Sequence, residues 1–177
     1  MPLPDMIHQQ HLAALTLMSS TLHAAGMTTQ LIEANDELPV SALVVDLGAD
    51  ELDRKRSMTI SIMPFGDDAF AATQFIQFYV PMPYAVTRDQ RGDLGQAMAV
   101  VNGAMAVGHF AWRGKEIFYR YMLSLSSSAF IDDAMLGELM PMLVFHQEHF
   151  SDYLEGVLDD EISLSILPDL VNSSDVE

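Results

Sequence analysis

Apolar residues recur at helical spacing in three stretches of the chain. The first runs from Asp5 to Ala25, with apolar residues every three to five positions, and Gly26 follows it as an end signal. The second runs from Asp93, a capping residue, to about Val107. The third begins at Asp132 or Asp133 and continues to about Leu158. These patterns predict three helices, with apolar stripes at Ile7, Leu12, Leu15, Met18 and Leu22 in the first and at Leu94, Met98, Val101 and Met105 in the second.

Two details modify the predicted helices. Pro141 lies inside the last one, where the missing N–H and the clash with the preceding turn should kink the helix or split it. Asn102 and Gly103 interrupt the middle helix with an amide and a missing side chain. We expect this pair to mark the close approach of another backbone.

Strand signals occupy the rest of the chain. The segment 57–63 alternates strictly, with Met58, Ile60 and Ile62 on one side and serine or threonine on the other, which predicts a sheet with one face open. Pro81 and Pro83 should end a strand that starts near residue 73. A glycine in the loop Arg113–Lys115 favours a hairpin. The predicted strands cover 28–34, 42–47, 57–63, 73–80, 109–112 and 116–123, with a polar loop at 48–56.

The resulting order is α-β-β-β-β-α-β-β-α. Strands and helices form separate blocks rather than alternating, which indicates an α+β fold with an antiparallel sheet. The length suits one domain, for which we predict the bounds 1–160, followed by an acidic C-terminal tail at 161–177.

The charge of the chain restricts its partners. Eight Lys and Arg stand against 25 Asp and Glu, a net charge of −17, which disfavours nucleic acid and anionic membranes and favours basic or apolar partners. The chain has no cysteine, so disulfides, thiolate catalysis and cysteine-bound zinc are excluded. No signal-peptide pattern and no membrane-spanning apolar run is visible, and we expect a cytoplasmic protein.

Four short motifs resemble a known family. They are A-x-x-V-V-N at 97–102, G-H-F at 108–110, I-x-Y-R-Y at 117–121, and a late helical aromatic, Tyr153. This pattern resembles the YbjN-like family of bacterial sensory transduction regulators, whose fold is similar to that of type III secretion chaperones. The resemblance implies a curved antiparallel sheet with helices packed on one face, a homodimer that binds a protein or peptide, and no catalytic residues or cofactors.

The predicted hairpin of strands 109–112 and 116–123 carries the residues that are most typical of a binding surface. Trp112, Tyr119, Arg120 and Tyr121 are residue types that concentrate binding energy in interfaces. If one face of the hairpin is exposed, these residues form a dimer seam or a peptide groove. A core sheet with buried aromatics explains the same pattern equally well.

Metal chemistry is the competing hypothesis. His146, His149 and Asp152 are spaced by three on one helix, which could place them on a shared face, but the HExxH order of zinc proteases is absent. An incidental polar helix face accounts for the same spacing. His8 with His11, and Asp67 with Asp68, are weaker clusters that we expect to be surface residues.

The sequence thus favours a non-enzymatic protein- or peptide-binding module, chaperone-like or regulatory and dimeric. The alternative from another class is a small metal-dependent enzyme that uses His146, His149 and Asp152. A third hypothesis is a structural subunit of a larger assembly.

Overall fold

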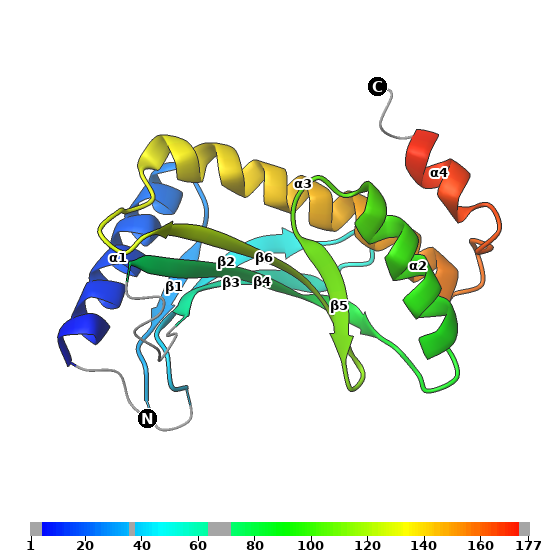
Figure 1. Cartoon of the computed structure of the whole chain (residues 1–177), viewed down its shortest axis with the longest axis horizontal. Coiled ribbons are helices and arrows are strands. Elements are labelled where there is room, and N and C mark those ends of the chain that lie inside the picture. The colour runs from blue at the N-terminus through cyan, green and yellow to red at the C-terminus, as the bar shows by residue number, and fades with distance from the viewer. Residues whose placement is uncertain (1–4, 36–37, 64–71, 174–177) are drawn as a thin grey trace. The chain divides into compact units, whose positions relative to one another are not determined.

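The computed structural model describes residues 5–35, 38–63 and 72–173 of the 177-residue chain. This part contains six strands and four helices, one helix more than the sequence pattern predicts (Figure 1). The predicted α+β class with an antiparallel sheet is confirmed. The elements are α1 (Asp5–Ala24), β1 (Thr29–Ile32), β2 (Ala42–Ala49), β3 (Lys55–Met63), β4 (Thr73–Ala85), α2 (Arg91–Ala104), β5 (His109–Arg113), β6 (Glu116–Ser126), α3 (Asp133–Leu158) and α4 (Leu167–Ser173).

The strands form one sheet in the order β1-β2-β3-β4-β6-β5. Leu43 on β2 pairs with Ile60 on β3, which pairs in turn with Phe78 on β4, and all three side chains are buried. The neighbouring register Val44, Thr59 and Tyr79 falls on the opposite face and is partly exposed. The alternation predicted for 57–63 therefore holds, except that Ser61 on the open face is itself buried.

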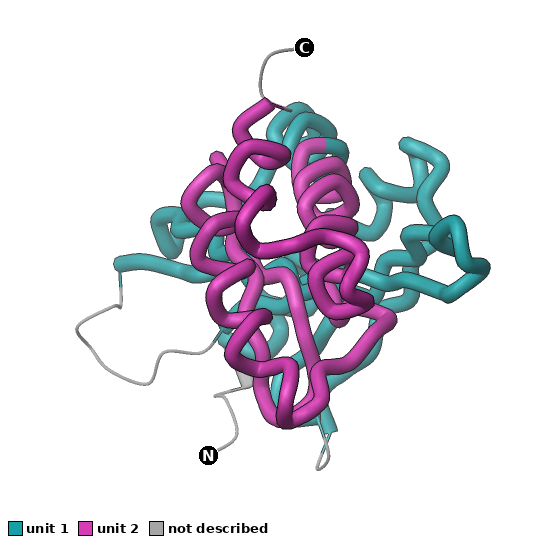
Figure 2. The backbone as a smooth tube through the Cα atoms, turned by 90° about the vertical axis from the view of Figure 1, so that its right-hand side faces the viewer, with its two compact units in different colours: residues 1–79, 121–141 teal, residues 80–120, 142–177 magenta. Residues whose placement is uncertain are grey.

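Backbone contacts group the chain into two compact units (Figure 2). Unit 1 comprises residues 1–79 and 121–141, and unit 2 comprises residues 80–120 and 142–177. Three elements, β4, β6 and α3, run from one unit into the other. The prediction of a single domain over 1–160 stays a prediction.

In unit 1, α1 packs against β1, β2 and β3 (Figure 1). Its buried stripe contains Ala14, Leu15, Met18 and Leu22. These positions overlap the predicted stripe, because an apolar face of this width is what a helix presents to a sheet.

In unit 2, the Asn102 side chain of α2 is hydrogen-bonded to the backbone of β5. The Asn102 Nδ2 atom donates to the Phe110 carbonyl at 2.9 Å, and the Phe110 N–H donates to Asn102 Oδ1 at 2.7 Å. The predicted close approach of a backbone is thus found at Asn102. Gly103 takes no part in it, because a Cβ atom there would meet nothing within 4 Å.

The start of α2 lies earlier than predicted. Gln90 is the N-cap residue and Asp93 lies in the first turn. The Gln90 side chain accepts a bond from the Thr87 N–H at 3.1 Å and donates to the Leu158 carbonyl at 2.7 Å, so it ties α2 to the end of α3. The Gln90 side chain makes no capping hydrogen bond to the helix itself.

One proline prediction was wrong. Strand β4 continues through Pro81 and Pro83 to Ala85. The two prolines are two residues apart, so both missing N–H groups fall on the same edge of the strand and the other edge keeps its donors. Pro141 lies within the 26 residues of α3, so of the two outcomes predicted for it, a kink or a split, the split does not occur.

Two further segments are more ordered than predicted. The polar loop at 48–56 shortens to a turn at 50–54, because β2 extends to Ala49 and β3 begins at Lys55. Part of the predicted acidic tail forms α4, which packs against α2 and buries Leu167 and Val171. In the described part of the chain, no helix is long and apolar enough to cross a membrane.

Candidate functional site

The aromatic residues predicted for binding occupy different environments. Tyr119 has no exposed surface: its ring centroid lies 5.5 Å from that of Phe110, and its hydroxyl donates to the Val107 carbonyl at 3.0 Å. Trp112 is 39% exposed and packs beside Gly95 of α2. Tyr121 belongs to unit 1, where its ring centroid lies 6.0 Å from that of Phe78.

Arg120 lies on the other face of β6, because side chains alternate along a strand. Its Nη2 atom lies 3.3 Å from His109 Nε2, and its buried Nε atom has no hydrogen-bond partner among the described residues. Tyr119 is therefore a core residue, Trp112 is partly exposed, and Arg120 points away from both. The structure does not bring the four residues together on one surface, and their role in binding stays a prediction.

The histidines of α3 pack against neighbouring aromatic rings of the same helix. His149 stacks on Phe145 with centroids 5.4 Å apart and an interplanar angle of 6°, and its edge meets Tyr153 at 5.5 Å. His146 Nδ1 lies 2.8 Å from the Met142 carbonyl. Among the described residues, no three His, Asp or Glu side chains are placed to hold a metal ion, so the spacing of His146, His149 and Asp152 does not become a metal site.

Of the two weaker predicted clusters, His8 and His11 lie among the described residues. Burial lowers the pKa of His11, and the neighbouring His8 lowers that pKa further. This pair lies on α1, and Asp67 and Asp68 lie outside the described residues.

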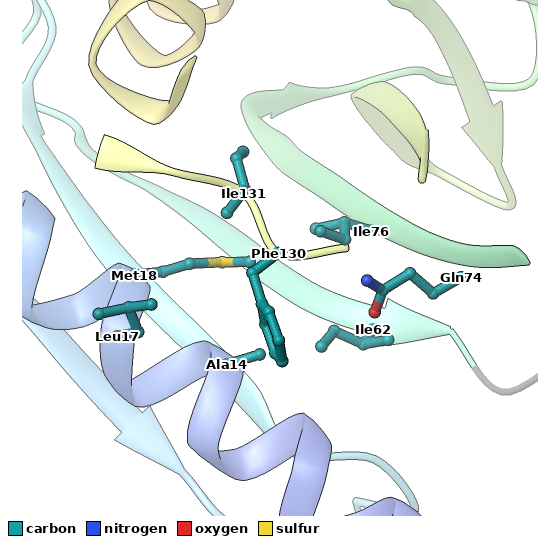
Figure 3. Close-up of a pocket in the computed structure, with 8 residues that line it drawn as sticks. All are labelled: Ala14, Leu17, Met18, Ile62, Gln74, Ile76, Phe130 and Ile131. Carbon is teal, nitrogen blue, oxygen red and sulfur yellow. The ribbon is translucent and has the colours of Figure 1, made fainter. Parts of the chain in front are cut away.

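An apolar groove that the sequence analysis did not predict lies within unit 1 (Figure 3). One wall is α1, the floor is formed by the ends of β3 and β4, and the second wall is the segment between β6 and α3. The space between these walls, open solvent included, is about 230 Å³. The lining residues are Ala14, Leu17 and Met18 of α1, Ile62 of β3, Gln74 and Ile76 of β4, and Phe130 and Ile131.

Two large apolar side chains of this groove are exposed. Phe130 is 64% exposed and Leu17 is 50% exposed. Figure 3 shows the Phe130 ring beside Ala14 of α1, with Ile62 on its other side. Complete burial of a large apolar side chain is worth roughly 1.5–3 kcal/mol relative to full exposure. Leu17 and Phe130 are only partly buried in the folded chain, so contact with a partner could supply the remaining part.

The segment that carries Phe130 is held in place by hydrogen bonds. The Ser127 N–H donates to the Ala72 carbonyl at 2.9 Å. The Gln74 Nε2 atom donates to the Ala129 carbonyl and lies 3.3 Å from the Ser126 carbonyl. The exposure of Phe130 therefore does not come from a loose loop, since its backbone is anchored on both sides of the preceding turn.

Sequence reasoning missed this groove for a specific reason. Leu17 lies outside the apolar stripe of its helix, and Phe130 follows the polar run 124–128, so neither belongs to a periodic pattern. The available signal was a leucine on the polar side of a helix. That signal is weak, because single exposed apolar residues are common on protein surfaces.

Comparison with known proteins does not assign the chain to a family. Neither a scan against models of protein families nor a search of curated proteins finds a match to this sequence. The resemblance to the YbjN-like family stays a prediction based on the short motifs.

Proposed function

We propose that this chain is a non-enzymatic protein-binding module whose unit 1 groove holds an apolar side chain of another protein. The observation that carries the proposal is the pair Leu17 and Phe130, which remain exposed although the backbone around them is fixed. Anchored, exposed apolar residues beside a depression are typical of interaction sites.

The chemistry of the lining supports binding rather than catalysis. Seven of the eight lining residues are apolar, and the eighth, Gln74, has its amide nitrogen committed to backbone carbonyls. Proton transfer and nucleophilic attack need titratable or nucleophilic groups at the site. None of the lining residues supplies such a group.

The shallowness of the groove argues against a small molecule as its occupant. Sites for small molecules usually enclose about 300–1,000 Å³ and bury most of the ligand. The groove encloses no such cavity, because the space of about 230 Å³ between its walls includes open solvent. An anchor residue of a peptide needs less space, and the rest of the partner would then contact the rim.

We also propose, as the sequence predicts, that the chain forms a homodimer and is located in the cytoplasm. Neither is needed for the groove to work. Light scattering across a concentration series measures the oligomeric state, and fractionation of the source cell measures the location.

The test is a selection of displayed random peptides on the purified full chain. We expect the selected peptides to share a large apolar residue and to lose binding to the variants Leu17→Glu and Phe130→Glu. Both positions are exposed, so the variants should fold as the natural chain does.

Leu52→Glu is the matched control. Leu52 is 68% exposed and lies in the turn after β2, away from the groove, so this variant makes the same chemical change at an unrelated place. Peptides that bind the groove variants and the natural chain equally well would overturn the proposal, and so would a selection that enriches nothing.

A further inference from the structure

The charges of unit 1 are distributed unevenly around the groove. Unit 1 contains three Lys and Arg against 13 Asp and Glu. The three cations are consecutive, Arg54 to Arg56, at the turn between β2 and β3, and Arg54 is paired with Asp50 at 2.6 Å. The helix α1 and the stretch 121–141, which form the two walls of the groove, contain no Lys or Arg at all.

Two hydrogen-bonded carboxylates follow the groove-lining segment in the sequence. Asp132 and Asp133 directly follow the lining residues Phe130 and Ile131, and both are exposed. The Thr21 hydroxyl donates to Asp133 Oδ1, and Thr21 lies one helical turn after Leu17. Asp133 is therefore held close to the Leu17 side of the groove.

Asp132 is held by the helix that it precedes. Its Oδ1 atom accepts the Met135 N–H at 2.8 Å, which is the geometry of an N-cap. Neither Asp132 nor Asp133 forms an ion pair with a described residue. The groove thus combines an apolar interior with two fixed negative charges that no cation of the described chain neutralises.

We propose that the partner segment is basic, with a large apolar side chain in the groove and Lys or Arg residues flanking it. This inference rests on the proposed function and specifies its partner. Opposite charges attract the segment to unit 1 and set its register at the rim, whereas an acidic segment is repelled by the same carboxylates. A second copy of this chain is a poor occupant, because it carries a net charge of −17 itself.

The test uses three synthetic peptides with one shared apolar anchor. Their flanking residues are lysine, glutamine or glutamate, and each peptide is titrated with the full chain by fluorescence anisotropy at low and high salt. We expect the lysine peptide to bind at least about tenfold tighter than the glutamate peptide at low salt, with a smaller ratio at high salt, because exposed charge pairs are each worth about 0.2–1 kcal/mol and are screened.

The double variant D132N/D133N tests whether Asp132 and Asp133 are the charges that attract the lysine peptide. Asparagine also caps helices and its amide oxygen can accept the Thr21 bond, so the fold is retained while two charges are removed. We expect this variant to weaken the lysine peptide about three- to tenfold and to leave the glutamine peptide unchanged. The matched control D159N/D160N removes two exposed carboxylates of unit 2 and should change neither affinity.

The outcomes separate the two proposals. Equal binding of all three peptides, lost in Phe130→Glu, would overturn the basic partner and keep the groove. An equal effect of D132N/D133N and D159N/D160N would also overturn it, because net charge rather than the rim would then be responsible. Absence of binding by every peptide would overturn both, and a concentration-dependent dimer that the Phe130→Glu variant abolishes would identify a second copy as the occupant.

Discussion

At the scale of single residues, Gly108 shows how a side chain later in the sequence, that of Tyr119, can restrict which residue fits at a backbone position. Gly108 has a φ of +71°, and a Cβ atom at this position would overlap the ring and hydroxyl of Tyr119. Tyr119 is buried and bonded to the Val107 carbonyl, so it cannot move aside without losing that bond. Gly114 has a similar φ of +66° but open space around it.

These two glycines give a matched prediction. Gly108→Ala should lower the free energy of unfolding by about 2–4 kcal/mol, because backbone strain and a core clash add. Gly114→Ala should lower it by only about 1–2 kcal/mol, from strain alone. Denaturant unfolding of both variants measures the difference. Equal losses would show that Tyr119 has room to adjust.

The histidines predict how stability depends on pH. Burial lowers the pKa of His11 and of His109, and the nearby His8 and Arg120 respectively lower each one further. Below about pH 6.5 the unfolded chain therefore binds more protons than the folded chain, and stability falls as the pH falls. Above this range both forms are neutral and the contribution of these groups is fully present.

We accordingly expect the free energy of unfolding to decrease between about pH 7 and about pH 5. The double variant H11Q/H109Q should show a smaller decrease, while Gln96→Ala, which changes an exposed residue without a titratable group, serves as the control. The measurement is a series of urea titrations across this pH range. An unchanged slope in H11Q/H109Q would mean that other groups set the pH dependence.

At the scale of elements, one amide supplies the hydrogen bonds described between α2 and β5. Asn102 satisfies both the N–H and the carbonyl of Phe110, and the sequence offered this position as an anomaly in mid-helix. Such a residue could be recognised without a structure because asparagine is unfavourable inside a helix unless its side chain is used. Its partner could not be recognised, since nothing in the sequence pairs residue 102 with residue 110.

Replacing this amide gives the next prediction. Asn102→Ala should lower the free energy of unfolding by about 2–4 kcal/mol, because two backbone groups of β5 lose their partner. Gln96→Ala on the exposed side of α2 should change it by less than about 0.5 kcal/mol. Denaturant unfolding compares the two, and hydrogen exchange at the Phe110 amide reports the lost bond directly. Protection at Phe110 equal to that of the natural chain would contradict the role assigned to Asn102.

The strand that was predicted to end too early shows why a local break signal can fail. Pro81 and Pro83 are such signals, yet β4 continues through them, and Pro141 does not split α3. A single residue weakens one or two hydrogen bonds, whereas packing along the whole element supplies many contacts. The bounds of the periodic segments, in contrast, were predicted to within a few residues. The apolar residues that form the periodic pattern in the sequence are the residues that make the packing contacts in the structure.

At the scale of the whole molecule, the α+β class followed from the order of strands and helices, but the candidate site did not. The groove requires Leu17, Ile62, Ile76 and Phe130 to meet, and they come from three elements and one connecting segment spread over more than half the chain. Only the sheet register and the anchored segment at 126–131 bring them together. The composition of the chain, however, already indicated an apolar or basic partner.

The net charge of −17 predicts a dependence of stability on salt for the whole molecule. Both units carry an excess of carboxylates, so self-repulsion opposes the compact state and dissolved salt screens it. The midpoint of thermal unfolding should therefore rise when sodium chloride is raised from about 10 mM to about 200 mM, over which range the screening length shrinks from about 30 Å to below 10 Å. Calorimetry at a fixed pH measures this shift.

A variant separates screening from other effects of salt. D159N/D160N removes two exposed negative charges, so its midpoint should be higher at low salt and should rise less with added salt than that of the natural chain. Lys115→Gln removes an exposed positive charge and should do the opposite. If all three proteins respond to salt alike, repulsion between carboxylates does not limit the stability of this fold, and the acidic surface would then have to be explained by the partners that it attracts or repels.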